Sequence, residues 1–112
     1  MPITLEVSDN GVAEVVVAWY PATRNIRDVP GFVGRLKVPV LMFAGENDYY
    51  AGCCLPQTAR ALAAAATGRP FELVVYPDTK HDFIYGGAHY NAEAYADAMR
   101  RTAAELARYF GR

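Results

Sequence analysis

The sequence LMFAGEND at residues 41–48 decides the fold, together with LVVYPDTKH at residues 73–81. Each segment begins with an apolar run, which is typical of a strand buried in a parallel sheet. Each then ends on a polar side chain, Asp48 in the first and His81 in the second. Sites of open α/β sheets lie at the carboxyl ends of their strands, so we expect this carboxylate and imidazole to meet there. The two segments therefore predict an acid–base pair.

The rest of the chain alternates between predicted strands and helices. Strands are expected at residues 12–19, 38–44 and 71–76, and helices at residues 32–36, 56–67 and from the N-cap Asn91 onward. In the last helix the apolar side chains follow helical spacing at Tyr95, Met99, Leu106, Tyr109 and Phe110. This order predicts the α/β fold class, with a small parallel sheet and flanking helices. Residues 3–7 alternate between apolar and polar, which predicts either an N-terminal antiparallel strand or a loose lead-in to the sheet.

Composition favours a single globular domain over residues 1–112. The chain is 53% hydrophobic and 21% charged, with a net charge of −1. A balanced charge gives no bias toward nucleic acid or an anionic membrane surface. The sequence also has no apolar run of about eighteen residues and no signal-like N-terminus, so we expect a cytoplasmic protein without a membrane partner. Cys53 and Cys54 are adjacent; we expect them not to bridge, because the loop would be very tight, which favours a reducing compartment.

Residues 15–110 resemble the C-terminal half of the dienelactone hydrolase family of α/β-hydrolases. The resemblance rests on residues 38–48, on residues 75–83 and on a terminal helix that ends at Phe110. It implies that Asp48 is the acid and His81 the base of a catalytic triad, that the substrate is a small ester or lactone, and that no cofactor takes part. The family's nucleophile lies in the preceding half, on a strand-to-helix elbow.

No such elbow occurs in this chain. The only serine is Ser8, and neither Gly-x-Ser-x-Gly nor Gly-x-Cys-x-Gly is present. The sequence thus predicts a truncated hydrolase domain that retains the acid and base and is inactive alone. The alternative is a non-catalytic binding or interaction module derived from the same fold.

Cys53 and Cys54 are the only substitute nucleophiles. The helix expected to begin near Pro56 would lower the pKa of a thiol beside its N-terminus, which also permits a third class, a thiol-based redox protein. Alternatively, both thiols simply pack the helix start. The cysteines show no recognised zinc-ligand spacing with His81, Asp82 or His89, so no metal site is predicted. Tyrosines in the same loops either line an aromatic pocket or cover the strand ends, namely Tyr49, Tyr50, Tyr85 and Tyr90.

The strand at residues 12–19 is expected to leave one edge without a neighbour. Unpaired, apolar strand edges promote association. We therefore expect either a homodimer with Val15, Val17 and Trp19 at its interface or a complementing hydrolase half at this edge. No nucleic-acid partner is predicted.

Overall fold

A parallel three-stranded sheet forms the centre of the fold. The computed structural model describes residues 15–84 and 87–110. Its strands lie in the order β1-β2-β3, with bounds Val16–Trp19, Val40–Gly45 and Phe71–Tyr76. This confirms the α/β class and the parallel sheet predicted from the sequence. The antiparallel strand predicted at residues 3–7 lies outside the described residues.

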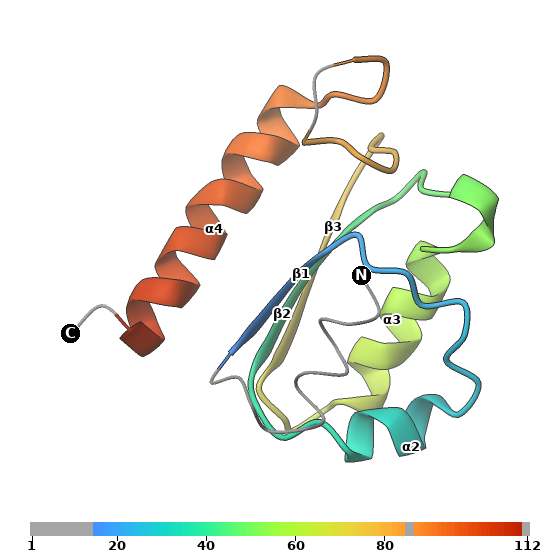
Figure 1. Ribbon diagram of the computed structural model, residues 1–112, viewed down its shortest axis with the longest axis vertical. Coiled ribbons are helices and arrows are strands. Elements are labelled where there is room, and N and C mark those ends of the chain that lie inside the picture. Colours follow the sequence, from blue (N-terminus) through green and yellow to red (C-terminus); the bar gives the residue numbers. More distant parts are fainter. Residues whose placement is uncertain (1–14, 85–86, 111–112) are drawn as a thin grey trace.

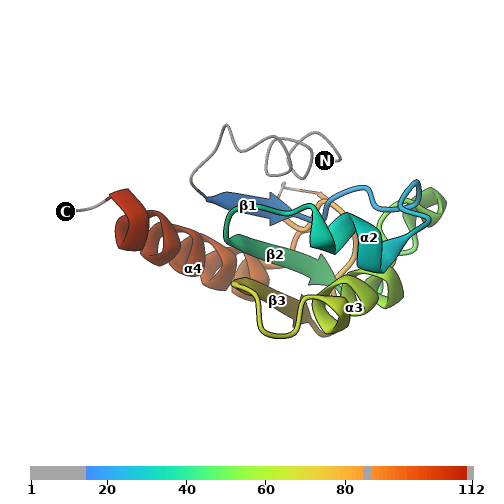
Figure 2. The same ribbon diagram turned by 90° about the horizontal axis from the view of Figure 1, so that it is seen from below.

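Helices cover both faces of this sheet. Figures 1 and 2 show α2 (Val29–Gly34) and α3 (Pro56–Ala65) on one face and α4 (Ala92–Phe110) on the other. A short 3-10 turn, η1 (Tyr50–Gly52), precedes α3. No helix of the described chain is long and apolar enough to cross a membrane.

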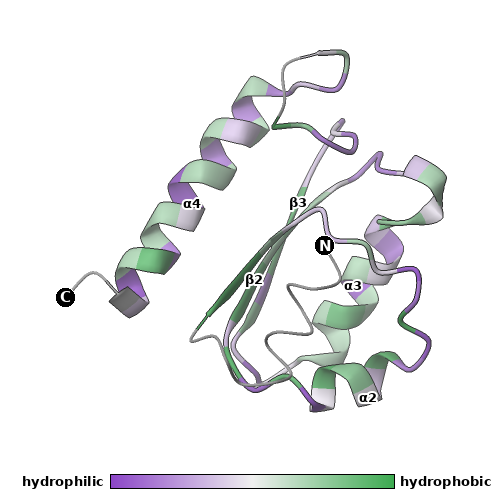
Figure 3. Ribbon diagram, in the orientation of Figure 1, coloured by the Kyte–Doolittle hydropathy of each residue, from purple (hydrophilic) through white to green (hydrophobic). Residues whose placement is uncertain are grey.

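Strand β2 is the central strand, and its side chains enter two separate cores. Figure 3 shows it as mostly hydrophobic. Met42 packs in the core that includes Leu62 of α3. Phe43 points to the opposite face, into a core that includes Ala94 and Ala98 of α4. This alternation is the period-2 geometry of a strand covered on both faces, and it explains why residues 40–44 are all buried.

Helix α4 packs on the sheet through small side chains. Ala94 and Ala98 are at most 3% exposed, whereas the larger Met99 and Leu106 are 44% and 41% exposed. Alanine lets the helix backbone approach the sheet closely, which the spacing of the larger apolar residues did not indicate. A hydrogen bond also joins this helix to β1, because the Trp19 indole N–H donates to Thr102 Oγ1 over 3.2 Å.

Both outer strands are less enclosed than the sequence indicates. Strand β3 was expected to be fully buried, but only Tyr76 of its residues is buried. Within the described residues no strand pairs with the outer edge of β3 or of β1. The homodimer expected at the β1 edge stays a prediction.

A polar cluster fastens α4 to the end of β3. The Tyr76 hydroxyl donates to Asp97 Oδ2 over 2.7 Å, and the same carboxylate accepts from Arg101 Nε over 2.7 Å and from Arg100. Burial and the hydrogen bond to Asp97 raise the pKa of Tyr76. The hydrogen bond from Tyr76, with those from the two arginines, lowers the pKa of Asp97 to about 2. The ionised carboxylate therefore stabilises the folded state.

We expect Asp97→Asn to lower the free energy of unfolding by about 1–2 kcal/mol at neutral pH. The pKa of Asp97 is lower in the folded chain than its ordinary 3.8, so its contribution is complete above about pH 4 and is lost as the pH falls toward 2. Urea unfolding of both proteins at several pH values measures this difference. Glu105→Gln, which removes a carboxylate two turns further along α4, is the control. A difference between Asp97→Asn and wild type that persists unchanged at pH 2 would contradict this account.

Candidate acid–base site

The site forms where the loops after β2 and β3 touch. The Gly45 position at the end of β2 lies so near the second loop that a Cβ there would be 2.3 Å from the Thr79 carbonyl oxygen. Two residues later, the Asn47 N–H donates to that same carbonyl over 2.9 Å. Only glycine permits this approach of two backbones, and it brings the segments after the two strands together.

Asp48 lies in the first loop and is completely buried. The turn that follows Gly45 closes with a hydrogen bond of 3.2 Å from the Asp48 N–H to the Gly45 carbonyl. One carboxylate oxygen, Oδ1, accepts a 3.3 Å hydrogen bond from the Tyr50 N–H. The other, Oδ2, lies 2.9 Å from His81 Nδ1. Burial together with these partners fixes the direction in which the carboxylate points.

His81 lies on the second loop, which other residues hold in place. Thr79 is buried, and its hydroxyl donates to the Pro77 carbonyl over 2.7 Å. Asn91 donates from its amide to that hydroxyl over 2.8 Å. The same Asn91 caps α4, accepting from the Ala94 N–H over 3.1 Å, as the sequence predicted. The helix start and the His81 loop are thus joined through one asparagine.

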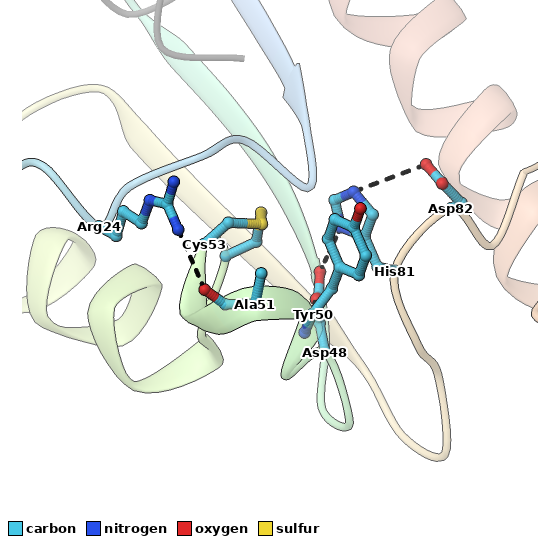
Figure 4. Close-up of a disulfide and its surroundings, with 8 residues drawn as sticks. Arg24, Asp48, Tyr50, Ala51, Cys53, His81 and Asp82 are labelled. Atoms are coloured by element: carbon cyan, nitrogen blue, oxygen red, sulfur yellow. Dashed lines mark hydrogen bonds and ion pairs between the residues drawn. A yellow bond between two sulfur atoms is a disulfide. The ribbon is translucent and has the colours of Figure 1, made fainter.

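His81 and Asp48 lie in contact, as the sequence predicted, and their catalytic roles stay a prediction. An aspartate carboxylate only accepts hydrogen bonds, so His81 Nδ1–H donates and Nε2 is the second ring nitrogen. Asp82 lies on the Nε2 side at 3.6 Å, with a side chain that is 52% exposed (Figure 4). That distance is too long for a hydrogen bond. Asp48 therefore orients the ring, and Asp82, which follows His81 in the sequence, does not.

Two tyrosine rings enclose the imidazole. Tyr50 stacks on His81 with ring centroids 5.1 Å apart, and Tyr20 meets it edge-on at 4.7 Å. Tyr50 itself is 63% exposed, so it covers the site from the solvent side (Figure 4). Of the other tyrosines predicted near the site, Tyr49 is 59% exposed, Tyr90 pairs with Tyr95 instead, and Tyr85 lies outside the described residues. Tyr20, directly after β1, was not identified from the sequence.

Cys53 and Cys54 are joined by a disulfide, so the expectation that they do not bridge is wrong (Figure 4). Consecutive side chains point to opposite sides of an extended chain but lie only about 100° apart at helical backbone angles. Cys53 has such angles, with φ −74° and ψ −33°, directly after the η1 turn. The helical bend at Cys53 is therefore what brings the two sulfurs together.

Among the described residues, the chemistry available at this site is that of an oriented base. Asp48 fixes the His81 tautomer with the proton on Nδ1, which leaves Nε2 with a lone pair to accept a proton from a nucleophile. The His81 side chain keeps 16% of its surface exposed beside the two tyrosine rings. In the disulfide form neither cysteine is a thiolate, and so neither is a nucleophile. His89 lies outside the pair; its Nδ1 is 3.0 Å from the His81 carbonyl oxygen.

Comparison with solved structures supports the hydrolase fold. A candidate dienelactone hydrolase from Klebsiella pneumoniae is 28% identical, with a TM-score of 0.79, over 96% of this chain and 48% of its own. Esterase 2 of the planctomycete Thermogutta terrifontis is 19% identical in a propionate-bound form, with a TM-score of 0.62, over 88% of this chain and 43% of its own. The same esterase phosphorylated by paraoxon gives a TM-score of 0.64, at 19% identity, over 88% and 41%.

The chain thus spans about half the length of these solved structures. No curated protein matches it. The model of the dienelactone hydrolase family matches residues 3–110, nearly the whole sequence. The chain belongs to the dienelactone hydrolase family.

Proposed function

We propose that this chain supplies the acid and the base of an ester or lactone hydrolase, with Asp48 as the acid and His81 as the base. The observation that supports this proposal most directly is the 2.9 Å contact between His81 Nδ1 and a fully buried Asp48 carboxylate. A structural tie between two loops does not require an ionisable ring whose second nitrogen faces away from its partner. The family membership favours the hydrolytic reading of this pair.

In this proposal the nucleophile comes from a part of the hydrolase fold that this sequence does not contain. No Gly-x-Ser-x-Gly or Gly-x-Cys-x-Gly elbow is present in residues 1–112. The unpaired outer edge of β1 supports the proposal, because a further strand can join the sheet there. Exposed apolar side chains on α4 supply a second surface for the missing half to cover, at Tyr95, Met99 and Leu106.

Reconstitution tests this function directly. The half of the Klebsiella pneumoniae protein that precedes the matched region is joined to the N-terminus of this chain, and hydrolysis of p-nitrophenyl acetate is measured. We expect no turnover above background from the 112-residue chain alone, because an acid–base pair without a nucleophile cannot form an acyl intermediate. The joined protein is expected to turn over.

Two results would contradict the proposal. Turnover by the free chain that His81→Ala abolishes would mean that this sequence needs no added nucleophile. A joined protein that unfolds cooperatively yet hydrolyses nothing would favour the binding module instead.

A further inference from the structure

The disulfide lies beside the acid–base pair. Ligand atoms of Cys53, Cys54 and His81 all lie within 4.8 Å of one another. Figure 4 shows Cys53 of the disulfide and the His81 ring on two different segments, of which the first precedes α3 and the second follows β3 in the chain. The three residues are spread over 29 positions of sequence, which is why ligand spacing gave no signal.

We propose that, when the disulfide is reduced, Cys53, Cys54 and His81 form a binding site for zinc. Two thiolates and an imidazole are the donors that zinc prefers, and three protein ligands leave a fourth position for water. Zn–S bonds of about 2.3 Å and Zn–N bonds of about 2.0–2.1 Å place the ligand atoms of a tetrahedral site with two sulfurs and one nitrogen about 3.5–3.8 Å apart. Atoms that now lie within 4.8 Å reach these separations through side-chain rotation and small loop shifts.

The surroundings of His81 support a metal-binding role for its second nitrogen. Zinc-bound histidines commonly donate their other N–H to a carboxylate, which fixes the ring and strengthens the ligand. Asp48 accepts that hydrogen bond from Nδ1 over 2.9 Å and is completely buried, so Nε2 is the nitrogen left for a metal. Cys54 is 4% exposed and Cys53 is half-buried, so the sulfurs lie at the edge of the interior, where a metal can enter.

Reduction is required before a metal can bind, because each sulfur is now bonded to the other. A water-soluble phosphine performs it: the phosphine takes an oxygen atom from water and becomes the phosphine oxide, and the two electrons and two protons convert the disulfide to two thiols. Zinc then displaces one proton from each thiol. Exchange with a small-molecule disulfide, which takes up the two electrons and is released as two thiols, converts the two thiolates back to the protein disulfide. This removes both thiolate ligands, so the metal-bound and disulfide forms exclude each other.

The test of the zinc site does not depend on the proposed hydrolase function, although both the site and the function use His81 Nε2. Binding of zinc by the isolated 112-residue chain needs no nucleophile and no ester. A bound metal would occupy the nitrogen that must accept a proton during hydrolysis. A chain that fails to bind zinc can still be tested for ester hydrolysis in the joined protein. A joined protein that hydrolyses no ester leaves zinc binding by the 112-residue chain to be measured.

Zinc binding by the intact chain, measured against a chromophoric zinc indicator, tests the proposal. We expect the phosphine-reduced protein to bind one zinc and the disulfide form to bind at least 100-fold more weakly. Both forms have the same sequence, so the comparison does not depend on whether a variant folds. With Co²⁺ as probe, the reduced protein should show a thiolate-to-metal charge-transfer band. A disulfide form that binds zinc equally well would overturn the proposal.

Variants then test the histidine. His81→Ala and Asp48→Asn are each expected to weaken zinc binding by the reduced protein at least tenfold, Asp48→Asn through loss of ring orientation. His89→Ala, which removes the other histidine, is the matched control and should bind as wild type. If the reduced His81→Ala protein held zinc as tightly as wild type, the site would be a simple dithiol and the proposed three-ligand site would be wrong.

Discussion

In the joined protein, which combines the preceding half of the Klebsiella pneumoniae protein with this chain, His81→Ala is expected to lower kcat/KM for p-nitrophenyl acetate by about 10³- to 10⁴-fold. Without the imidazole no group accepts the proton of the nucleophile, so covalent catalysis loses its base. Asp48→Asn is expected to cause a similar loss, because an amide no longer holds His81 in the tautomer with the proton on Nδ1. Initial rates at substrate concentrations well below KM give this ratio directly.

Asp82→Asn is the matched control for the acid. Asp82 also lies near the His81 ring, but at 3.6 Å and with a half-exposed side chain. We expect kcat/KM to stay within a few-fold of wild type. A loss as large as that of Asp48→Asn would mean that Asp82 is the working carboxylate, and the assignment of Asp48 would then be wrong.

Gly45→Ala is expected to have the largest structural effect among the substitutions near the site. A Cβ at Gly45 would meet the Thr79 carbonyl oxygen at 2.3 Å and its carbonyl carbon at 2.8 Å. Backbone atoms cannot turn aside as a flexible side chain can, so the two loops must separate. We expect a loss of about 2–3 kcal/mol in the free energy of unfolding. Because Asp48 and His81 lie on these loops, the rate at which the joined protein hydrolyses p-nitrophenyl acetate should also fall about 100-fold.

Gly34→Ala is the control for this substitution. A Cβ at Gly34, the last residue of α2, meets no atom within 4 Å. Alanine there should leave stability unchanged or raise it by up to about 1 kcal/mol. Urea denaturation of both variants measures the two effects side by side. Equal stability of Gly45→Ala and wild type would show that the loops are not in contact.

The sequence was sufficient to predict that Asp48 and His81 lie close together, because the pattern that indicates this contact is local. Asp48 and His81 each follow an apolar strand, and parallel strands bring their carboxyl ends to one edge. Asn91 was likewise predicted as an N-cap, and the structure confirms it. What the sequence did not indicate is that Asn91 also holds Thr79 in the His81 loop, since that contact joins residues 12 positions apart across a turn.

Features that depend on tertiary contact were missed. Gly45 has no sequence signal beyond being a glycine after a strand; its role comes from the Thr79 carbonyl beside it. Tyr20 follows a strand that is distant in sequence from His81. The disulfide between Cys53 and Cys54 depends on backbone angles that the sequence alone does not specify.

The tautomer of His81 is the measurement that tests the acid–base account most directly. A two-bond ¹H–¹⁵N correlation spectrum of the imidazole rings, with His81→Ala used to assign the signals, distinguishes a proton on Nδ1 from one on Nε2. We expect neutral His81 to carry its proton on Nδ1 in the 112-residue chain and to lose that preference in Asp48→Ala. A proton on Nε2 in wild type, unchanged in Asp48→Ala, would show that Asp48 does not orient the ring and would contradict the account.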